Sequence, residues 1–380
     1  MKTNNRLYVD VHVLQTVPPS CVNRDDTGSP KTALYGGATR ARVSSQCWKK
    51  AIRDMFKNED IFPKDELGIR TKNLVQQVAK QIQVIDPSIG VEESEKFARD
   101  TINFASKKPN KPIIPKPKDK EDDSESDKSA ALFFITPIQS YSVAKLAVKW
   151  RKEDEKPSRE AVTEALMKGR GIDIALFGRL VAQAPDINID ACAQVAHSIS
   201  THKVSNEYDY FTAVDDLSPE DNTGAGHIGT VEFNSSTLYR YATVDVHNLH
   251  KQLQDDTIDA VCGFIRAFVH SMPTGKQNTF ANRTLPKAVL VTLRADQPVN
   301  LVGAFEKPVP ASVDGYEAAS AERLVAHARS VYKNFAGEPE LSLVAGELLS
   351  ELGAVQPIKK LLDTLAGDLR ARLVNGGDVQ

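Results

Sequence analysis

Alternation of apolar and polar residues predicts a strand near the start of the chain. Apolar side chains occupy the odd positions from Leu7 to Val13, and Tyr8, Asp10 and His12 lie between them. A period of two residues is typical of a strand with one buried face. We therefore expect a half-buried strand over residues 7–15.

Six segments make up the predicted central fold. Apolar residues recur at helical spacing in two of them, and the other four are rich in strand-forming residues. In chain order they are strand 7–15, helix 45–56, strand 172–177, strand 238–246, helix 257–272 and strand 288–293. This order is the ferredoxin-like one that RNA-recognition domains use, so we expect an α+β fold.

The rest of the pattern predicts peripheral helices, an insertion and an extended arm. Helices are expected over 71–84, 94–105, 143–152, 158–167, 189–202, 317–335 and 358–373, and 130–137 fits a strand or the start of a buried helix. Residues 107–128 are rich in Lys, Pro and acids, which predicts a mobile surface insertion. Residues 206–233 predict two strands joined by a turn-rich tip.

Positive charge is concentrated in residues 18–53. This stretch has a net charge of +5, whereas the whole chain has −2. Its two acids are Asp25 and Asp26, and its basic residues are Arg24, Lys31, Arg40, Arg42, Lys49, Lys50 and Arg53. A focused basic segment in a mildly acidic chain is typical of a surface that meets phosphates.

The layout of this stretch favours phosphate binding. Gly36 and Gly37 allow positive φ or a close approach to a ligand. The strand-like TRARV would then place Arg40 and Arg42 on one face. Ser44 or Ser45 is a candidate N-cap of the next helix, whose free N–H groups attract anions. A solvated helix after an ordinary loop is the alternative.

The same helix is predicted to be amphipathic. Trp48, Ile52 and Phe56 share one face, and the opposite face carries polar and basic side chains. These are Gln46, Lys49, Lys50 and Arg53. The helix would bury its apolar face and present its basic one.

Composition excludes several classes of protein. No apolar run has the ~18 residues of a membrane span, and the N-terminus lacks the features of a signal peptide. The four cysteines, Cys21, Cys47, Cys192 and Cys262, are far apart, which favours reduced thiols in a cytoplasmic protein over disulfides or a zinc site. The histidines have no metal-ligand spacing, so no metal or cofactor is expected.

Three further motifs leave alternatives open. GAGHIG at 224–229 matches G-x-G-x-x-G, but it precedes a strand, so we interpret it as part of a hairpin. Tyr210 and Phe211 could stack on bases or form a small core under the arm. GKQNTFANR at 275–283 places Lys276 and Gln277 in a Gly turn, which suits phosphate contacts or an ordinary polar loop.

Several segments resemble the CasC family, the repeated backbone subunit of the type I-E Cascade CRISPR surveillance complex in antiviral defence. The first is VDVHVLQTVPPSCVNRDDTGSPKTALYGGATRARVSSQCWKKAIR. The others follow in order: GIDIALFGRL, AHSISTHKV, DYFTAVDDL, GAGHIGTVEF, LYRYATVDV and GKQNTFANR. The resemblance spans most of the chain and is weak at 107–128 and in the C-terminal region.

The resemblance implies a fold shaped like a right hand. Residues 1–60, 170–202 and 234–380 would form a discontinuous palm with a modified ferredoxin-like, RRM-like fold. Residues 61–169 would form a helical fingers domain that contains the flexible 107–128 insertion, and 203–233 a β-hairpin thumb.

The resemblance also implies a non-catalytic function. Several copies would form a helical filament along CRISPR RNA (crRNA), and each would grip the backbone while its thumb displaces a nucleotide and leaves bases open for target DNA. Base pairing reads the sequence in such complexes, so the protein holds backbone and shape. Further copies of itself and the large, small, 5′-handle-capping and repeat-processing subunits of Cascade would be partners, with no membrane.

Site residues are assigned by resemblance and by charge. By resemblance, the palm contacts RNA through Arg24, Lys31, Ser44, Gln46, Lys49, Lys50 and Arg53, while Arg179 and Leu180 lie near the bases and Phe211, Thr212 and His227 belong to the thumb. Leu180 stands where some relatives have Met. The basic pattern adds Arg40, Arg42, Lys276 and Gln277.

Two other functions are compared with this one. Asp25 or Asp26 could hold a metal ion in an RNase, although paired acids in a loop are more often turn formers or ion-pair partners of Arg24 and Lys31. A single-strand binder outside CRISPR would also need a basic groove, but no guide RNA or partner subunits.

Overall fold

The structure is a computed structural model that describes residues 6–107, 111–115, 132–213 and 227–375. The chain divides into two compact units, which we describe separately. Unit 1 comprises residues 1–56, 194–247 and 258–380, and unit 2 comprises 57–193 and 248–257. The arm at 203–233 is part of unit 1. Residues 170–193, which the resemblance assigned to the palm, fall in unit 2.

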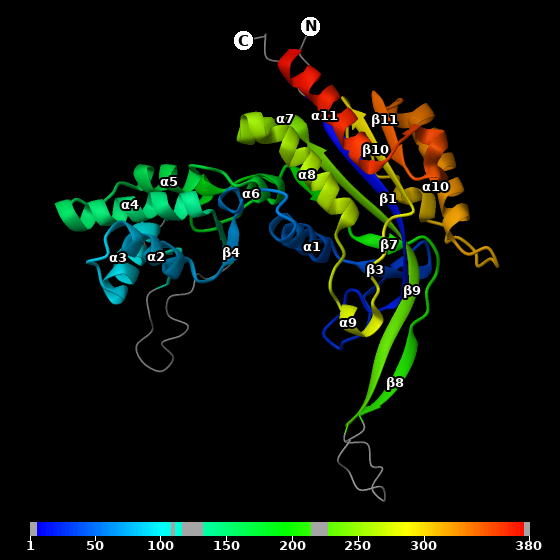
Figure 1. Cartoon of the computed structure of the whole chain (residues 1–380), viewed down its shortest axis with the longest axis horizontal. Helices are drawn as coiled ribbons and strands as arrows, with labels where there is room; N and C mark the ends of the chain where they lie inside the picture. Colours follow the sequence, from blue (N-terminus) through cyan, green and yellow to red (C-terminus); the bar gives the residue numbers. More distant parts are fainter. Residues whose placement is uncertain (1–5, 108–110, 116–131, 214–226, 376–380) are drawn as a thin grey trace, which may run out of the picture. The chain divides into compact units, whose positions relative to one another are not determined.

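A ten-stranded sheet forms the centre of unit 1 (Figure 1). Its strands lie in the order β12-β11-β10-β1-β9-β7-β3-β2, and β6 and β8 also pair with β9. Their bounds are β1 (Tyr8–Ser20), β2 (Thr32–Tyr35), β3 (Ala38–Val43), β6 (Ala193–Val195), β7 (Ser198–Ser200), β8 (Glu207–Ala213), β9 (His227–Asp245), β10 (Ala288–Arg294), β11 (Leu341–Ala345) and β12 (Ala354–Val355). β1 is antiparallel to both β9 and β10, so the long first strand organises the sheet.

Helices cover the sheet of unit 1. They are α1 (Ser45–Asn58), α8 (Thr257–His270), α9 (Gln277–Phe280), α10 (Glu317–Val331) and α11 (Ile358–Asn375), while α7 (Val246–Leu253) runs from one unit into the other. Leu14 of β1 packs in a core with Leu324 of α10. The next residue, Gln15, faces the other side, because its side chain accepts a hydrogen bond from Arg240, which contacts α1 and α8.

Arg240 of β9 links four elements inside unit 1. Its guanidinium carbon lies 3.7 Å from the ring centre of Trp48 in α1 and 4.5 Å from that of Phe268 in α8. It donates hydrogen bonds to the Gln15 side chain of β1, at 2.6 Å, and to the Phe268 carbonyl. Burial lowers the pKa of Arg240 to about 9. A buried cation needs such partners, so Arg240 fixes α1 against the sheet.

A long two-stranded arm extends from the sheet. β8 pairs with the first part of β9, from Glu207 opposite Phe233 to Ala213 opposite His227, and Figure 1 shows this hairpin projecting beyond the other strands. Its expected tip, including part of GAGHIG, lies outside the described residues.

A two-residue turn joins β2 to β3. Tyr35 pairs with Ala38, and the turn residues Gly36 and Gly37 have φ values of +56° and +72°. Positive φ at both positions is typical of the type I′ turns of hairpins. A Cβ atom on Gly36 would lie 1.6 Å from the Glu306 carbonyl oxygen, whereas one on Gly37 would meet no atom within 4 Å. The absence of a side chain at Gly36 therefore allows the turn to pack directly against the Glu306 carbonyl.

Unit 2 is mainly helical. Its elements are β4 (Ile69–Thr71), α2 (Leu74–Ile85), α3 (Val91–Asn103), β5 (Phe133–Ile135), α4 (Pro137–Glu153), α5 (Arg159–Met167) and α6 (Ile172–Phe177). Apolar side chains of α2 to α5 share one core. Thr136 caps α4 through a reciprocal capping box with Gln139.

Part of the predicted insertion is packed onto unit 2, which corrects the expectation of an unstructured 107–128. Ile113 and Ile114 are buried in its core. The Asn103 side chain accepts the Ile114 N–H at 2.9 Å and donates to its carbonyl at 3.1 Å. Residues 116–128 lie outside the described residues.

Two predicted elements were wrong. Residues 172–177 form helix α6 in place of a strand. A short, uniformly apolar run has no polar positions whose spacing could distinguish a strand from a helix, so the sequence pattern could not decide between them. Residues 189–202 form strands β6 and β7 in place of a helix. β7 gains its hydrogen bonds from β3 and β9, partners that local propensity does not reveal. β7 thus takes the place expected for 172–177 in the strand-helix order.

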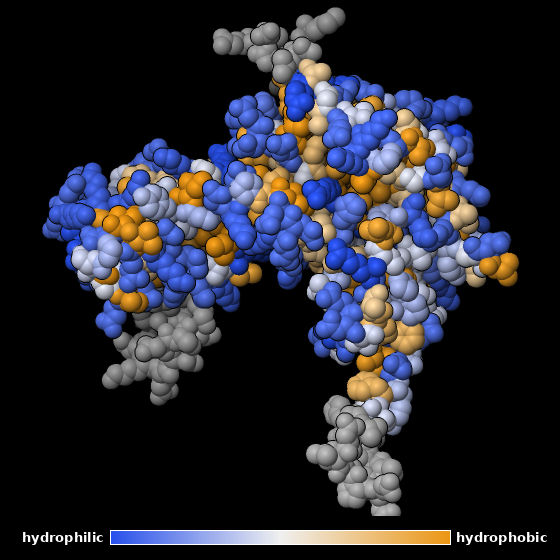
Figure 2. Space-filling view, in the orientation of Figure 1, coloured by the Kyte–Doolittle hydropathy of each residue, from blue (hydrophilic) through white to orange (hydrophobic). Residues whose placement is uncertain are grey.

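No helix within the described part of the chain is long and apolar enough to span a membrane. Hydrophilic residues dominate the face shown in Figure 2, and hydrophobic residues gather there in smaller patches.

The two turn glycines provide a matched test. We expect Gly37→Ala to destabilise unit 1 by about 1 kcal/mol, the cost of positive φ for an L-residue. Gly36→Ala should cost at least ~2 kcal/mol more, because its Cβ also clashes with a backbone carbonyl. Urea unfolding would be followed by Trp48 fluorescence in a Trp150→Phe background, since the chain has two tryptophans. Equal losses would contradict the close approach at Gly36.

Candidate nucleic-acid interface

The loop between β1 and β2 is fixed to the start of α1. The Lys31 N–H donates to the Asn23 carbonyl at 2.8 Å, and the Arg42 N–H donates to the Lys31 carbonyl at 2.9 Å. The Asn23 side-chain oxygen accepts the Ser44 N–H at 2.9 Å. Residues of the loop therefore lie beside the end of β3 and the N-terminus of α1.

Asp25 shapes this loop from within. Its carboxylate accepts hydrogen bonds from the Thr27 hydroxyl at 2.7 Å and from the Thr27 and Ser29 N–H groups at 3.0 Å. These bonds, above all that of the Thr27 hydroxyl, hold the pKa of Asp25 below its usual range. Such bonds to nearby backbone are those of a turn former, the ordinary alternative for this acid.

Ser44 is the N-cap of α1. Its hydroxyl accepts the Cys47 N–H at 3.3 Å, and its carbonyl accepts the Trp48 N–H at 3.1 Å. Trp48 is buried and donates from Nε1 to the Ser198 hydroxyl of β7 at 2.9 Å. The expected N-cap is thus confirmed at Ser44, and the helix presents its N-terminal end next to the loop.

Lys31 and Arg42 lie near a histidine that sequence reasoning did not select. The His197 ring nitrogen Nδ1 accepts the Ser45 N–H at 3.3 Å. Burial lowers the pKa of His197, and the charges of Arg42 and Lys31 lower it further. The sequence around residue 197 gives no sign of this location, because pairing of β7 with β3 brings His197 close to residues that are about 150 positions away in the chain.

A second loop brings another lysine to the same region. Gly275 contacts the backbone of Val22 so closely that a Cβ there would lie 2.1 Å from the Val22 carbonyl oxygen. Burial raises the pKa of the Cys21 thiol, the charges of Arg24 and Lys276 oppose this rise, and the charges of Glu232 and Asp25 add to it. Arg24 and Lys276 therefore lie close to one residue, and Gln277, next in the chain, is exposed.

A small cleft lies between the loop after β1 and the sheet. It is lined by side chains of β1, β3, β9 and the loop after β1, among them Ser20, Asn23, Lys31, Arg42, Asn234 and Ser236. The sequence analysis did not select Asn23, Asn234 or Ser236. Their common location depends on strand pairing between residues more than 200 positions apart.

Four cations gather in this region. Within the part of the chain that the structure describes, they form no ion pair. We call this set the cation cluster: Arg24, Lys31, Arg42 and Lys276. Unpaired cations beside a helix N-terminus attract phosphate groups.

The basic face of α1 continues from the cation cluster along the helix. Gln46 and Lys50 are exposed, and Lys49 and Arg53 are half-buried. Lys50 forms an ion pair with Asp54 at 2.6 Å, one helical turn away. This exposed pair contributes little to stability, so it leaves Lys50 able to exchange its partner.

Two of the arginines expected to contact RNA are buried, which corrects their assignment. Arg40 is fully buried and donates to the carbonyls of Ser200, Phe305 and Glu306 at 2.8–3.2 Å. Arg179 in unit 2 donates to several carbonyls, including that of Ile187 at 3.0 Å. Because backbone oxygens occupy both guanidinium groups, neither is presented to a ligand.

The remaining expected positions lie on exposed elements. Leu180 is 82% exposed in unit 2. On the arm, Phe211 is 39% exposed and Thr212 is exposed. The Phe211 ring covers Gly229 on the paired strand, where a Cβ would lie 2.4 Å from it. The Phe211 side chain thus packs within the arm and stays partly exposed. The side chain of His227 lies outside what the structure describes.

Among the described residues, no group of three or more His, Cys, Asp or Glu side chains could hold a metal ion.

The comparisons with known proteins found one family model and similar solved structures. A model of the CT1975-like protein family matches residues 9–366. One similar solved chain comes from a CRISPR RNA-guided surveillance complex in a pre-nicking state. It is 31% identical with a TM-score of 0.82, covering 95% of this chain and 99% of that one. A chain of another CRISPR RNA-guided surveillance complex is 27% identical with a TM-score of 0.74 and the same coverage. No curated protein sequence matches.

Proposed function

We propose a function on the premise that the chain belongs to the CT1975-like protein family. The protein is a non-catalytic backbone subunit of a CRISPR RNA-guided surveillance complex, of the type I-E Cascade class. Several copies assemble along one CRISPR RNA and hold its backbone, so that its bases stay available for target DNA. The likeness to surveillance-complex chains over 95% of this chain supports the assembly.

The observation that carries RNA binding is the cation cluster. Its members come from three segments of the chain, and hydrogen bonds within the protein fix the loop that carries Arg24 and Lys31. Such a surface needs little reorganisation before it binds a phosphate backbone. The positive end of the α1 dipole lies in the same region, beside Ser44.

Residues beyond the cluster extend the proposed RNA path. Gln46, Lys49, Lys50 and Arg53 continue it along α1, and Gln277 beside Lys276 extends it on the second loop. Ser44 contributes through the capped helix end. Most of these side chains suit contacts to the phosphate backbone of RNA. Such contacts are expected of a protein in whose complex base pairing, and not the protein, recognises the sequence.

The fold supports a finer proposal about the domains. Strands β1, β7, β9 and β10, with α1 and α8 between them, follow the ferredoxin-like order expected of a palm. The helices of unit 2 correspond to fingers and the β8–β9 hairpin to a thumb. We propose that Phe211, Thr212 and His227 displace a nucleotide at regular intervals, and that Leu180 contacts bases.

The RNase alternative is not supported at Asp25. Three hydrogen bonds within the loop go to Oδ1 of its carboxylate and give Asp25 the contacts of a turn former.

Removal of cluster charges should weaken RNA binding without regard to sequence. We expect Lys31→Ala, Arg42→Ala and Lys276→Ala, combined, to raise the Kd for guide RNA at least about tenfold. The slope of log K against log salt should fall by about two, because each lost phosphate contact removes ~0.7 for a single strand. Binding of several unrelated RNAs would be measured by filter retention across a salt series.

The matched control removes three exposed cations elsewhere in unit 1, through Lys307→Ala, Arg329→Ala and Lys359→Ala. It should change neither the Kd nor the salt slope appreciably. A loss in the cluster variant that depends on RNA sequence, or an equal loss in the control, would contradict backbone gripping.

The nuclease alternative has a direct test. We expect Asp25→Asn with Asp26→Asn to leave target and guide RNA uncleaved, as in the unaltered protein, with Mg²⁺ or Mn²⁺ present. Labelled RNA on a denaturing gel gives the readout, and RNA retention on filters gives the binding control. Cleavage by the unaltered protein that this double variant loses, with RNA binding intact, would replace the proposed function by an RNase.

A further inference from the structure

The cleft between the loop after β1 and the sheet has the size of one hydroxyl group. Its volume is about 20 Å³, and a single water-sized group needs about 10–15 Å³. A phosphate group, whose oxygens surround its phosphorus atom, and a nucleic-acid base are both too large to enter. Because Lys31 and Arg42 of the cation cluster also line the cleft, a phosphate held there would bring the neighbouring sugar to its opening.

A chain of hydrogen bonds orients Asn234, which is buried in the wall of the cleft. The ionised Glu232 carboxylate only accepts hydrogen bonds, so Asn206 donates to it through Nδ2, at 3.1 Å. The Asn206 side-chain oxygen then accepts the Asn234 Nδ2 group, also at 3.1 Å. The Asn234 side-chain oxygen itself forms no hydrogen bond in the described part of the chain. It is therefore an acceptor that a ligand can use.

Two more polar side chains of the cleft have unused hydrogen-bonding capacity. Asn23 accepts the Ser44 N–H through Oδ1, so its Nδ2 group is a donor, and this donor has no partner among the described residues. Ser236 is 6% exposed, and its hydroxyl likewise has no partner there. Val17 and Leu238 contribute apolar surface to the lining. An acceptor, two donors and an apolar wall match a hydroxyl group on a sugar ring.

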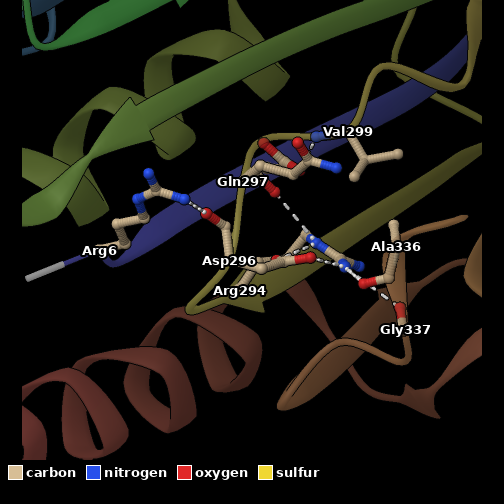
Figure 3. Close-up of polar contacts among 8 residues, drawn as sticks. Arg6, Arg294, Asp296, Gln297, Val299, Ala336 and Gly337 are labelled. Atoms are coloured by element: carbon tan, nitrogen blue, oxygen red, sulfur yellow. Dashed lines mark hydrogen bonds and ion pairs between the residues drawn. The ribbon is translucent and has the colours of Figure 1, made fainter. Parts of the chain in front are cut away.

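A buried side chain elsewhere in unit 1 shows the contrast. Arg294 holds the Asp296 carboxylate through hydrogen bonds of 2.7 and 2.9 Å. It also donates to the carbonyls of Gln297, Ala336 and Gly337 (Figure 3). These contacts tie separate segments of the fold together. The unused amide and hydroxyl groups of the cleft form no such link, which points to a ligand.

We propose that the cleft receives the 2′-hydroxyl group of one ribose and thereby makes each copy select RNA over DNA. This inference rests on the proposed function, which brings an RNA backbone to the cation cluster. The 2′-hydroxyl donates to the Asn234 side-chain oxygen and accepts from Asn23 Nδ2 and the Ser236 hydroxyl. A phosphate oxygen cannot donate, so it would leave the Asn234 acceptor unpaired.

Selection follows from the polar groups that DNA would leave without a partner. A site that hydrogen-bonds a hydroxyl group rejects the analogue that lacks it, because the groups of the site then stay desolvated and unpaired. Asn206 is a positioning residue in this scheme, since it acts only by turning the Asn234 oxygen away from the arm and towards the cleft.

Sugar-modified forms of one short oligonucleotide test the proposal without altering the protein. The oligonucleotide holds one copy, and the Kd is measured by filter retention at one salt concentration for forms with the same bases. The 2′-deoxy form should bind about fivefold more weakly than the 2′-hydroxyl form. The 2′-O-methyl form cannot donate and is too large for the cleft, so it should bind at least about tenfold more weakly. Equal Kd values for all three forms would overturn the inference.

A protein variant assigns the effect to the cleft. Ser236→Ala removes one hydroxyl from it, and Ser235→Ala at the exposed neighbouring position is the matched control. Ser236→Ala should bind the 2′-hydroxyl form about fivefold more weakly and the 2′-deoxy form as the unaltered protein does. Ser235→Ala should leave both Kd values unchanged. The same loss on both forms, or no loss, in Ser236→Ala would contradict the proposal. Failure of the unaltered protein to bind any of the three forms would instead refute the proposed function.

Discussion

One buried cation joins the main elements of unit 1. Arg240 lies between the rings of Trp48 and Phe268 and donates to Gln15, so a single guanidinium contacts β1, α1 and α8 from its place on β9. A buried guanidinium that loses one partner carries a high desolvation cost. The arrangement of helices on this face of the sheet therefore depends on keeping every one of these contacts.

The position of α1 in turn determines the candidate interface. With Trp48 held against Arg240 and bonded to Ser198, the helix begins at the end of β3. Its capping residue Ser44 is itself held in place, because Asn23 binds its N–H group. The cation cluster is thus built on elements that the core fixes, and the arm and unit 2 carry the positions assigned to bases.

Sequence reasoning succeeded where local pattern and burial agree. The strand at 7–15, the helix α1 with its buried Trp48 and the cap at Ser44 all have short-range signals. The expectation that this strand is only half-buried was wrong, because Asp10 and His12 on its second face are buried as well. Sequence reasoning failed where partners that are distant in the sequence determine the secondary structure or the burial of a residue. Residues 198–200 become a strand through pairing with β3 and β9. Alternation placed Arg40 and Arg42 on one face of β3, but it could not show that the chain at Phe305 covers Arg40.

The most direct test of the account is the RNA that the protein carries in its assembly. The chain would be co-expressed with the other subunits of a surveillance complex, with and without a CRISPR array, and the bound RNA of the purified complex would be sequenced. The account predicts a large assembly with uniform guide RNA and several copies of this chain for each partner subunit. Heterogeneous cellular RNA, or an assembly without RNA, would contradict it.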